Sequence, residues 1–246
     1  MRPILLVVIA ACGGGSDSPQ DARPVDAAPK CTFAPDLRVI AHKVEAFGSN
    51  NGGRFDGMIC IEGRSDLGCT ATDLEKKFEI CAPKGEFGLR LKGVPFESTL
   101  YLHGPDMFMF GPPFTVGDAD FVRTKIWEPA GGTFPPTTDG NLVVLVLNSN
   151  NRVIGAQVAV LPSAGLNVRY LDDLGETDPQ LTATTGAGLA VIPNVPVGDI
   201  DIQVTSSMFP NCKFQSGGYV SPDNSQDARV KIVAGATVVA AIDCTL

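Results

Sequence analysis

Short apolar runs separated by Gly, Pro, Asn and Asp make up most of the chain from Leu37 onward. Several of them alternate apolar and polar side chains, which is typical of strands with one buried face, and no run has a helical period. The pattern therefore predicts an all-β fold of packed sandwiches. The predicted strands are residues 37–44, 58–61, 70–73, 78–81, 87–91, 141–147, 155–161, 168–171, 181–185, 189–192, 200–205, 230–233 and 237–243.

The first twelve residues follow a different pattern, with Arg2, an apolar run over 4–9, and then Ala10-Ala11-Cys12. This is the layout of a secretory signal, and the run is too short to cross a bilayer, which takes ~20 apolar residues. The sequence Ile9-Ala10-Ala11-Cys12 resembles the lipobox of bacterial lipoproteins. The resemblance implies that residues 1–11 are a signal peptide and that Cys12 carries palmitate and related acyl chains. The competing interpretation is a fortuitous apolar start of a cytoplasmic protein.

Residues 12–30 contain one valine, no aromatic residue and no larger aliphatic residue, so the sequence predicts a disordered tether between the lipid and the first domain. Gly13 follows the cysteine where an Asp would retain a protein at the inner membrane, which resembles lipoproteins sorted to the outer membrane. The expected location is therefore the cell envelope, lipid-anchored in the outer membrane. Both the periplasmic and the surface-facing orientation remain open.

Composition narrows the possible partners. The chain of 246 residues has 27 acidic and 19 basic residues, for a net charge of −8. Phosphate backbones would be repelled, so nucleic acid is not an expected partner. The remaining expected partners are the membrane, through Cys12, and an envelope protein or carbohydrate.

Six cysteines remain after Cys12, and an even number in an exported protein favours disulfides. Zinc is the competing interpretation, but the sequence has no Cys-x-x-Cys pair and only two histidines. Cys212–Cys244 is the one pair available in the second half. Three pairings are possible in the first half, and a hairpin with its turn at residues 63–68 favours Cys60–Cys69, which leaves Cys31–Cys81.

Two stretches carry the same order of turn and strand residues. Thr72-Asp73, Phe78-x-Ile80, Pro83 and Gly85-x-Phe87 resemble the carboxypeptidase regulatory-like, or transthyretin-like, β-sandwich family, except at 75–77, where the family usually has a turn glycine. Thr184, Gly186, Gly188 and the Pro-rich turn before Gly198 repeat the order. The resemblance implies two tandem transthyretin-like or immunoglobulin-like domains, at residues 31–128 and 140–246, with a linker at 129–139.

Recognisable catalytic motifs are missing from the sequence: it has no Gly-x-Ser-x-Gly, no phosphate-binding glycine loop and no His-Glu-x-x-His. With His42 and His103 as the only histidines, a serine–histidine–aspartate set is a poor expectation. We therefore expect a non-catalytic structural or binding module that recognises protein or carbohydrate. The alternative is an envelope hydrolase with an unrecognised site in the cleft between the domains.

Two stretches are candidates for binding. The acidic turn with Asp172, Asp173, Glu176 and Asp178 offers the oxygen ligands that calcium prefers, although its spacing is not that of an EF-hand and acidic turns are often simply solvated. The cluster Met107-Phe108-Met109-Phe110 is either an exposed patch for an envelope partner or a loop folded onto the core. No other cofactor is expected.

Overall fold

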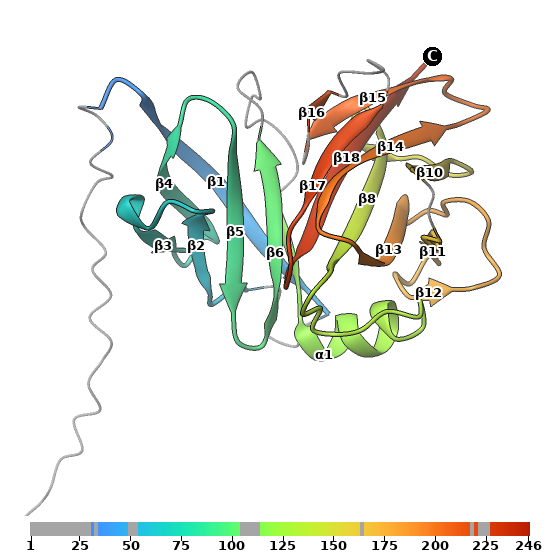
Figure 1. Ribbon diagram of the computed structural model, residues 1–246, viewed down its shortest axis with the longest axis horizontal. Coiled ribbons are helices and arrows are strands. Elements are labelled where there is room, and N and C mark those ends of the chain that lie inside the picture. The colour runs from blue at the N-terminus through green and yellow to red at the C-terminus, as the bar shows by residue number, and fades with distance from the viewer. Residues whose placement is uncertain are drawn as a thin grey trace, which may run out of the picture.

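The computed structural model describes residues 31, 34–48, 54–103, 114–162, 165–216, 219–220 and 227–246. Within these ranges almost all regular structure is β-strand, arranged in three sheets, so the predicted all-β sandwich class is confirmed. The two halves of the chain lie side by side, with β6 and β18 close to their boundary (Figure 1).

The first half folds as a sandwich of two sheets. One has the order β4-β1-β7, and the facing strands have the order β6-β5-β2-β3. The space between them is filled by a core rich in phenylalanine. The elements of this half are β1 (Leu37–Phe47), β2 (Met58–Ile61), η2 (Ser65–Leu67), β3 (Cys69–Ala71), β4 (Lys77–Pro83), β5 (Phe87–Gly93), β6 (Phe96–His103) and β7 (Phe114–Gly117).

The second half is also a sandwich, with one sheet of order β10-β14-β17-β16 facing β8, β13, β18 and their neighbours. Its core is aliphatic, dominated by Val, Ile, Leu and Ala. The strands of this half are β8 (Gly140–Asn148), β9 (Asn151–Arg152), β10 (Gln157–Leu161), β11 (Arg169–Leu171), β12 (Thr177–Asp178), β13 (Leu189–Val195), β14 (Gly198–Thr205), β15 (Asn211–Ser216), β16 (Tyr219–Val220), β17 (Ala228–Ile232) and β18 (Thr237–Thr245).

One long sheet runs through both halves, because the last strand of the chain inserts between them. β18 pairs in parallel with β8 on one side and with β6 on the other. β6 and β18 each bury side chains on both faces. Leu100 and Leu102 of β6 pack in the second core, whereas Tyr101 packs in the first. A strand that is buried on both faces has a continuous run of apolar residues, and β18 has such a run at Val238–Ile242.

A short helical segment covers the face of the long sheet opposite the second core. Asp118 caps it by accepting hydrogen bonds from the backbone N–H groups of Asp120 and Phe121. The segment consists of α1 (Ala119–Phe121) and the π-helical turn η3 (Val122–Trp127). Its apolar side chains pack on Leu171 and Val191 in a third, smaller core.

The structure contains the three predicted disulfides, Cys31–Cys81, Cys60–Cys69 and Cys212–Cys244. Cys60 lies directly opposite Cys69 in the β2–β3 hairpin, and Cys212 opposite Cys244 in the β15–β18 pair. Strand register thus places both pairs within bonding reach, with Cα separations of 4.3 and 3.9 Å.

Two expectations from the pattern are wrong. Residues 181–185 form no strand, because Thr184 is buried and its hydroxyl accepts from the N–H of Ala156 and donates to the carbonyl of Val153. The sequence shows no helical period, so α1 and η3 were not predicted. The buried positions 122, 126 and 127 of η3 follow the wider spacing of a π-turn.

The described ranges contain no helix with the length and apolar character needed to cross a bilayer.

Candidate binding pocket

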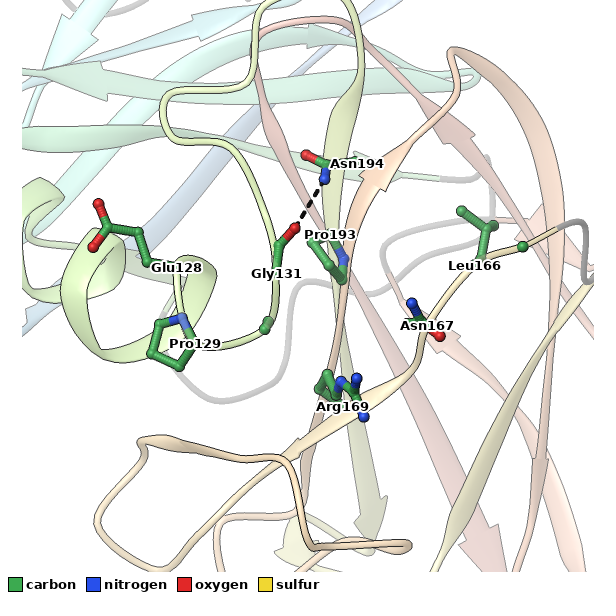
Figure 2. A pocket seen from close by; sticks show the side chains of 10 residues that line it. Glu128, Pro129, Gly131, Leu166, Asn167, Arg169, Pro193 and Asn194 are labelled. Carbon is green, nitrogen blue, oxygen red and sulfur yellow. Dashed lines mark hydrogen bonds between the residues drawn. The ribbon is translucent and has the colours of Figure 1, made fainter.

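The second half has a hollow of about 300 Å³ beside the C-terminal end of η3 (Figure 2). One wall is the turn that follows the helix, from Glu128 to Gly131. The opposite side is formed by the segment before β11, which contributes Leu166, Asn167 and Arg169, and by Pro193 and Asn194 of β13. Residues more than sixty positions apart in the chain therefore meet at one concave surface.

The helix wall has a fixed shape because the helix ends in a Schellman motif. The N–H of Gly132 donates to the carbonyl of Trp127, and the N–H of Gly131 donates to that of Glu128. Gly131 has φ of 83°, the left-handed conformation that this motif requires and that glycine adopts without strain. A Cβ atom on Gly132 would lie 2.7 Å from Pro193, so this turn sits closely against β13.

The strand wall is held by three polar residues, Asn141, Asn194 and Thr133, which we call the bulge cluster. The register of β13 with β8 shifts between Ile192 and Val195, and Asn194 in this bulge has φ of 53°. Its side-chain oxygen accepts from the N–H and the hydroxyl of Thr133, at 3.0 and 2.7 Å, and its amide donates to the carbonyl of Gly131. Its backbone N–H donates to the side-chain oxygen of fully buried Asn141.

The floor of the pocket carries a cation. Arg169 lies at the start of β11, opposite Val191, and its Nε is buried with no hydrogen-bond partner among the described residues. Asn167, two positions earlier, is exposed at the rim. The one carboxylate in the lining, Glu128, accepts from Arg123 at 3.1 Å and is half exposed. These groups suit the binding of a polar ligand, and they contain no nucleophile next to a base.

The boundary between the halves, where the alternative hypothesis places a hydrolase site, contains a buried carboxyl group. Glu97 of β6 is buried there, and its carboxylate accepts from the hydroxyl of Thr237 at 2.7 Å and from the indole N–H of Trp127 at 3.3 Å. We call these three residues the junction cluster. Burial raises the pKa of Glu97 to about 7, against smaller opposing effects of hydrogen bonds from Thr237, Trp127 and the backbone of Gly117.

Gly117 lets β7 approach the junction cluster. A Cβ atom at this position would lie 2.1 Å from Val122 and 2.9 Å from the carboxylate of Glu97. Nearby Tyr101 donates to the carbonyl of Thr115, and its burial raises the pKa of this phenol to about 12. The junction therefore joins β6, β7, β18 and the helical segment around one buried carboxyl group.

The acidic turn predicted as a calcium site is tied to other parts of the protein. Asp172 accepts from the backbone of Leu174 and Glu176, and Asp173 accepts from Gly186. Glu176 pairs with Lys125 of η3 at 2.9 Å, and Asp178 accepts from the N–H of Gln180. Among the described residues no three His, Cys, Asp or Glu side chains converge as a metal site would require.

Other predicted residues lie outside the described ranges: Cys12, and the candidate partner patch Met107, Phe108, Met109 and Phe110. His42 packs on the ring of Phe114, with ring centres 4.7 Å apart, and its Nδ1 accepts from the N–H of Lys43. The polar residues of the pocket and Glu97 were missed in the sequence, because each is an isolated residue without a motif.

The chain matches no protein-family model. It matches no curated protein either. Solved structures with some likeness include the minor pilin GBS52 of Streptococcus agalactiae, at 10% identity and a TM-score of 0.28 over 85% of this chain and 82% of that one. The major pilin subunit BcpA of Bacillus cereus has 15% identity and a TM-score of 0.27, over 86% of this chain and 57% of that one.

The Bacillus anthracis TIE protein has 9% identity and a TM-score of 0.26, and the likeness covers 85% of this chain but only 34% of that protein. At these identities and TM-scores the likenesses carry no argument about function. The all-β sandwich architecture rests instead on the strand pairing and the cores described above.

Proposed function

We propose that this protein is a non-catalytic binding module of the bacterial cell envelope, anchored to the membrane by lipid on Cys12. The observation that carries the proposal is the polar pocket of the second half. Its walls are fixed by a helix-ending motif and by the bulge cluster, so it exists before any ligand arrives. Preformed concave sites with a few convergent polar groups are the usual form of small-ligand sites.

The rigid joint between the halves supports a role in presenting this pocket. β18 is hydrogen-bonded to β6 and β8 at once, so the two sandwiches share one sheet. A ligand bound by the second half is then held at a fixed orientation to the first half, which the tether joins to the membrane. Around Glu97 the boundary between the halves is joined by hydrogen bonds from Thr237 and Trp127.

The resemblance to the carboxypeptidase regulatory-like family belongs to the same proposal. Thr72 donates to the carbonyl of Phe55, and Asp73 accepts from the backbone of Glu75 and Lys77. Lys76 has φ of 64°, so this turn uses the left-handed conformation at the place where the family usually has a glycine. A left-handed residue in this turn is compatible with the glycine that the family usually has there.

Metabolic labelling tests the anchor. We expect labelled palmitate on the wild-type chain, and we expect Cys12→Ser to lose both the label and sedimentation with membranes. Protease treatment of intact cells then separates the periplasmic from the surface-facing orientation. An unlabelled wild-type chain, or a Cys12→Ser variant that stays on membranes, would contradict the proposed anchoring.

A further inference from the structure

We propose that the pocket beside η3 binds an acidic sugar, with the carboxylate of a hexuronate unit on Arg169 and its hydroxyls on the polar rim. This inference rests on the proposed binding function and names its ligand class. Figure 2 shows Arg169 and Asn167 on one side of the hollow, with Glu128 and Gly131 on the other.

Arg169 is the group that selects a carboxylate. Within the described ranges its guanidinium forms no ion pair, and its Nε is buried against the protein without a hydrogen-bond partner. The two terminal Nη groups of a guanidinium can donate parallel hydrogen bonds to one carboxylate, so a ligand can be bound without reaching the buried Nε. The planar guanidinium therefore fits a carboxylate better than a neutral hydroxyl.

The rest of the lining suits a hydroxylated ring. The side-chain amide of Asn167 both donates and accepts, as a sugar hydroxyl does. Pro129 and Pro193 present apolar ring edges to the carbon skeleton. The volume of about 300 Å³ lies at the lower end of the roughly 300–1,000 Å³ range of small-ligand sites, which favours one sugar ring over a length of peptide.

The single cation in the lining argues against a phosphate. Arg169 can neutralise a singly charged carboxylate but only half of a doubly charged group. Glu128, at the far edge of the hollow, pairs with Arg123, and Figure 2 shows its carboxylate directed away from Arg169. The net charge of −8 repels every anion at long range, so we expect weak binding that one favourable contact dominates.

Calorimetric titration of the full chain in detergent micelles tests the assignment. The probes are the methyl glycoside of galacturonate, the methyl glycoside of galactose and inorganic phosphate. We expect the galacturonoside to bind at least about tenfold more tightly than the galactoside, and phosphate to bind more weakly than the galacturonoside. Backbone amide shifts should move at the lining residues Gly131, Leu166, Asn167 and Arg169.

Variants then separate the two parts of the site. Arg169→Gln should remove the preference for galacturonoside over galactoside, whereas Asn167→Ala should weaken both sugars several-fold. Arg64→Gln is the matched control, because this arginine is exposed and paired with Asp66 in the first half. If Arg169→Gln fails to fold, loss of the preference in strong salt for the wild-type chain reports on the same ion pair.

Each outcome decides the inference. Equal affinity for the two sugars would overturn the role of Arg169 while leaving a sugar-binding module. Binding of neither sugar, tighter binding of phosphate, or shifts confined to another surface would overturn the ligand class. Palmitate labelling is independent of all these results, so failure of the ligand assignment can be told apart from failure of the anchoring.

Discussion

The junction cluster and the bulge cluster are both sets of polar side chains that hydrogen-bond separate segments together, yet they differ in burial and in chemistry. The junction cluster is built on a carboxyl group, Glu97, whose pKa burial raises to about 7. The bulge cluster is built on the amides of Asn141 and Asn194, which carry no charge. Stability at the junction should therefore depend on pH, whereas the pocket wall should keep its shape across the same range.

The two clusters also have different structural roles. The junction cluster joins elements from both halves, so its loss should affect the whole fold. The bulge cluster fixes one turn against one strand, so its loss should mainly affect the pocket. The bulge cluster contains no titratable side chain, so its hydrogen bonds do not depend on ionisation.

The largest expected effect is at Trp127, which is 1% exposed and contributes to both the third core and the junction cluster. Trp127→Ala should lower the free energy of unfolding by about 3–5 kcal/mol, through lost burial and a cavity. Trp127→Phe keeps most of the apolar volume but loses the donor to Glu97, and should cost less. Chemical denaturation measures both, with Leu174→Ala, at an 81% exposed position, as a control expected to change little.

The next effect is the pH dependence of the junction. The folded-state pKa of Glu97, about 7, lies above the ordinary value of 4.5, so between these pH values the folded state holds a proton that the unfolded state has lost. The stability that this proton contributes is complete below pH 4.5 and is lost as the pH rises toward 7. The loss is on the order of 3 kcal/mol.

Glu97→Gln isolates this contribution, because the amide keeps acceptor and shape but does not titrate. Unfolding free energies of wild type and variant, measured by denaturation at several pH values, should diverge as the pH rises from 4.5 to 7, with the wild type losing more. Parallel curves for the two proteins would mean that Glu97 is not the titrating group. The variant Asp66→Asn, at an exposed position, serves as the control carboxylate.

A smaller effect is expected at the bulge cluster. Asn194→Ala removes the hydrogen bonds to Thr133 and Gly131 and places alanine at φ of 53°. We therefore expect the free energy of unfolding to fall by about 2 kcal/mol. Asn194→Gly removes the same hydrogen bonds, but glycine adopts this backbone conformation without strain, so its free energy of unfolding should fall less. Thermal melts at pH 5 and pH 8 should give the same difference from wild type at both values, and a difference that changes with pH would break the contrast between the clusters.

The smallest effect concerns a third polar region, the acidic turn at residues 172–178. Its carboxylates already accept from backbone groups or pair with Lys125, so calcium has no cluster of spare ligands to bind there. We expect the melting temperatures with calcium and with chelator to agree within about 1 °C. A calcium-dependent rise that disappears in Asp173→Asn would restore the calcium hypothesis for this turn.

A comparison of predicted and observed strands shows which strands the local pattern of apolar and polar residues could predict. The alternating runs at residues 78–81 and 87–91 became β4 and β5, because a half-buried strand needs one apolar face whatever its partner is. β6 was missed, since Phe96–His103 buries residues on both faces and does not alternate. β15 was missed because Asn211–Ser216 is largely polar and becomes a strand through its disulfide-linked partner β18.

By itself, the sequence determined the all-β class and most of the strands, because these follow from side-chain alternation and turn residues. It favoured the observed pairing of the six cysteines, with hairpin spacing pointing to Cys60–Cys69, but left other pairings in the first half possible. Only the tertiary structure decided that β18 joins the two halves, that Glu97 is buried between them, and that Arg169 meets Asn194 at one pocket. These features come from contacts between residues far apart in the chain, and a single charged or amide residue carries no local sign of the surroundings that the fold will give it.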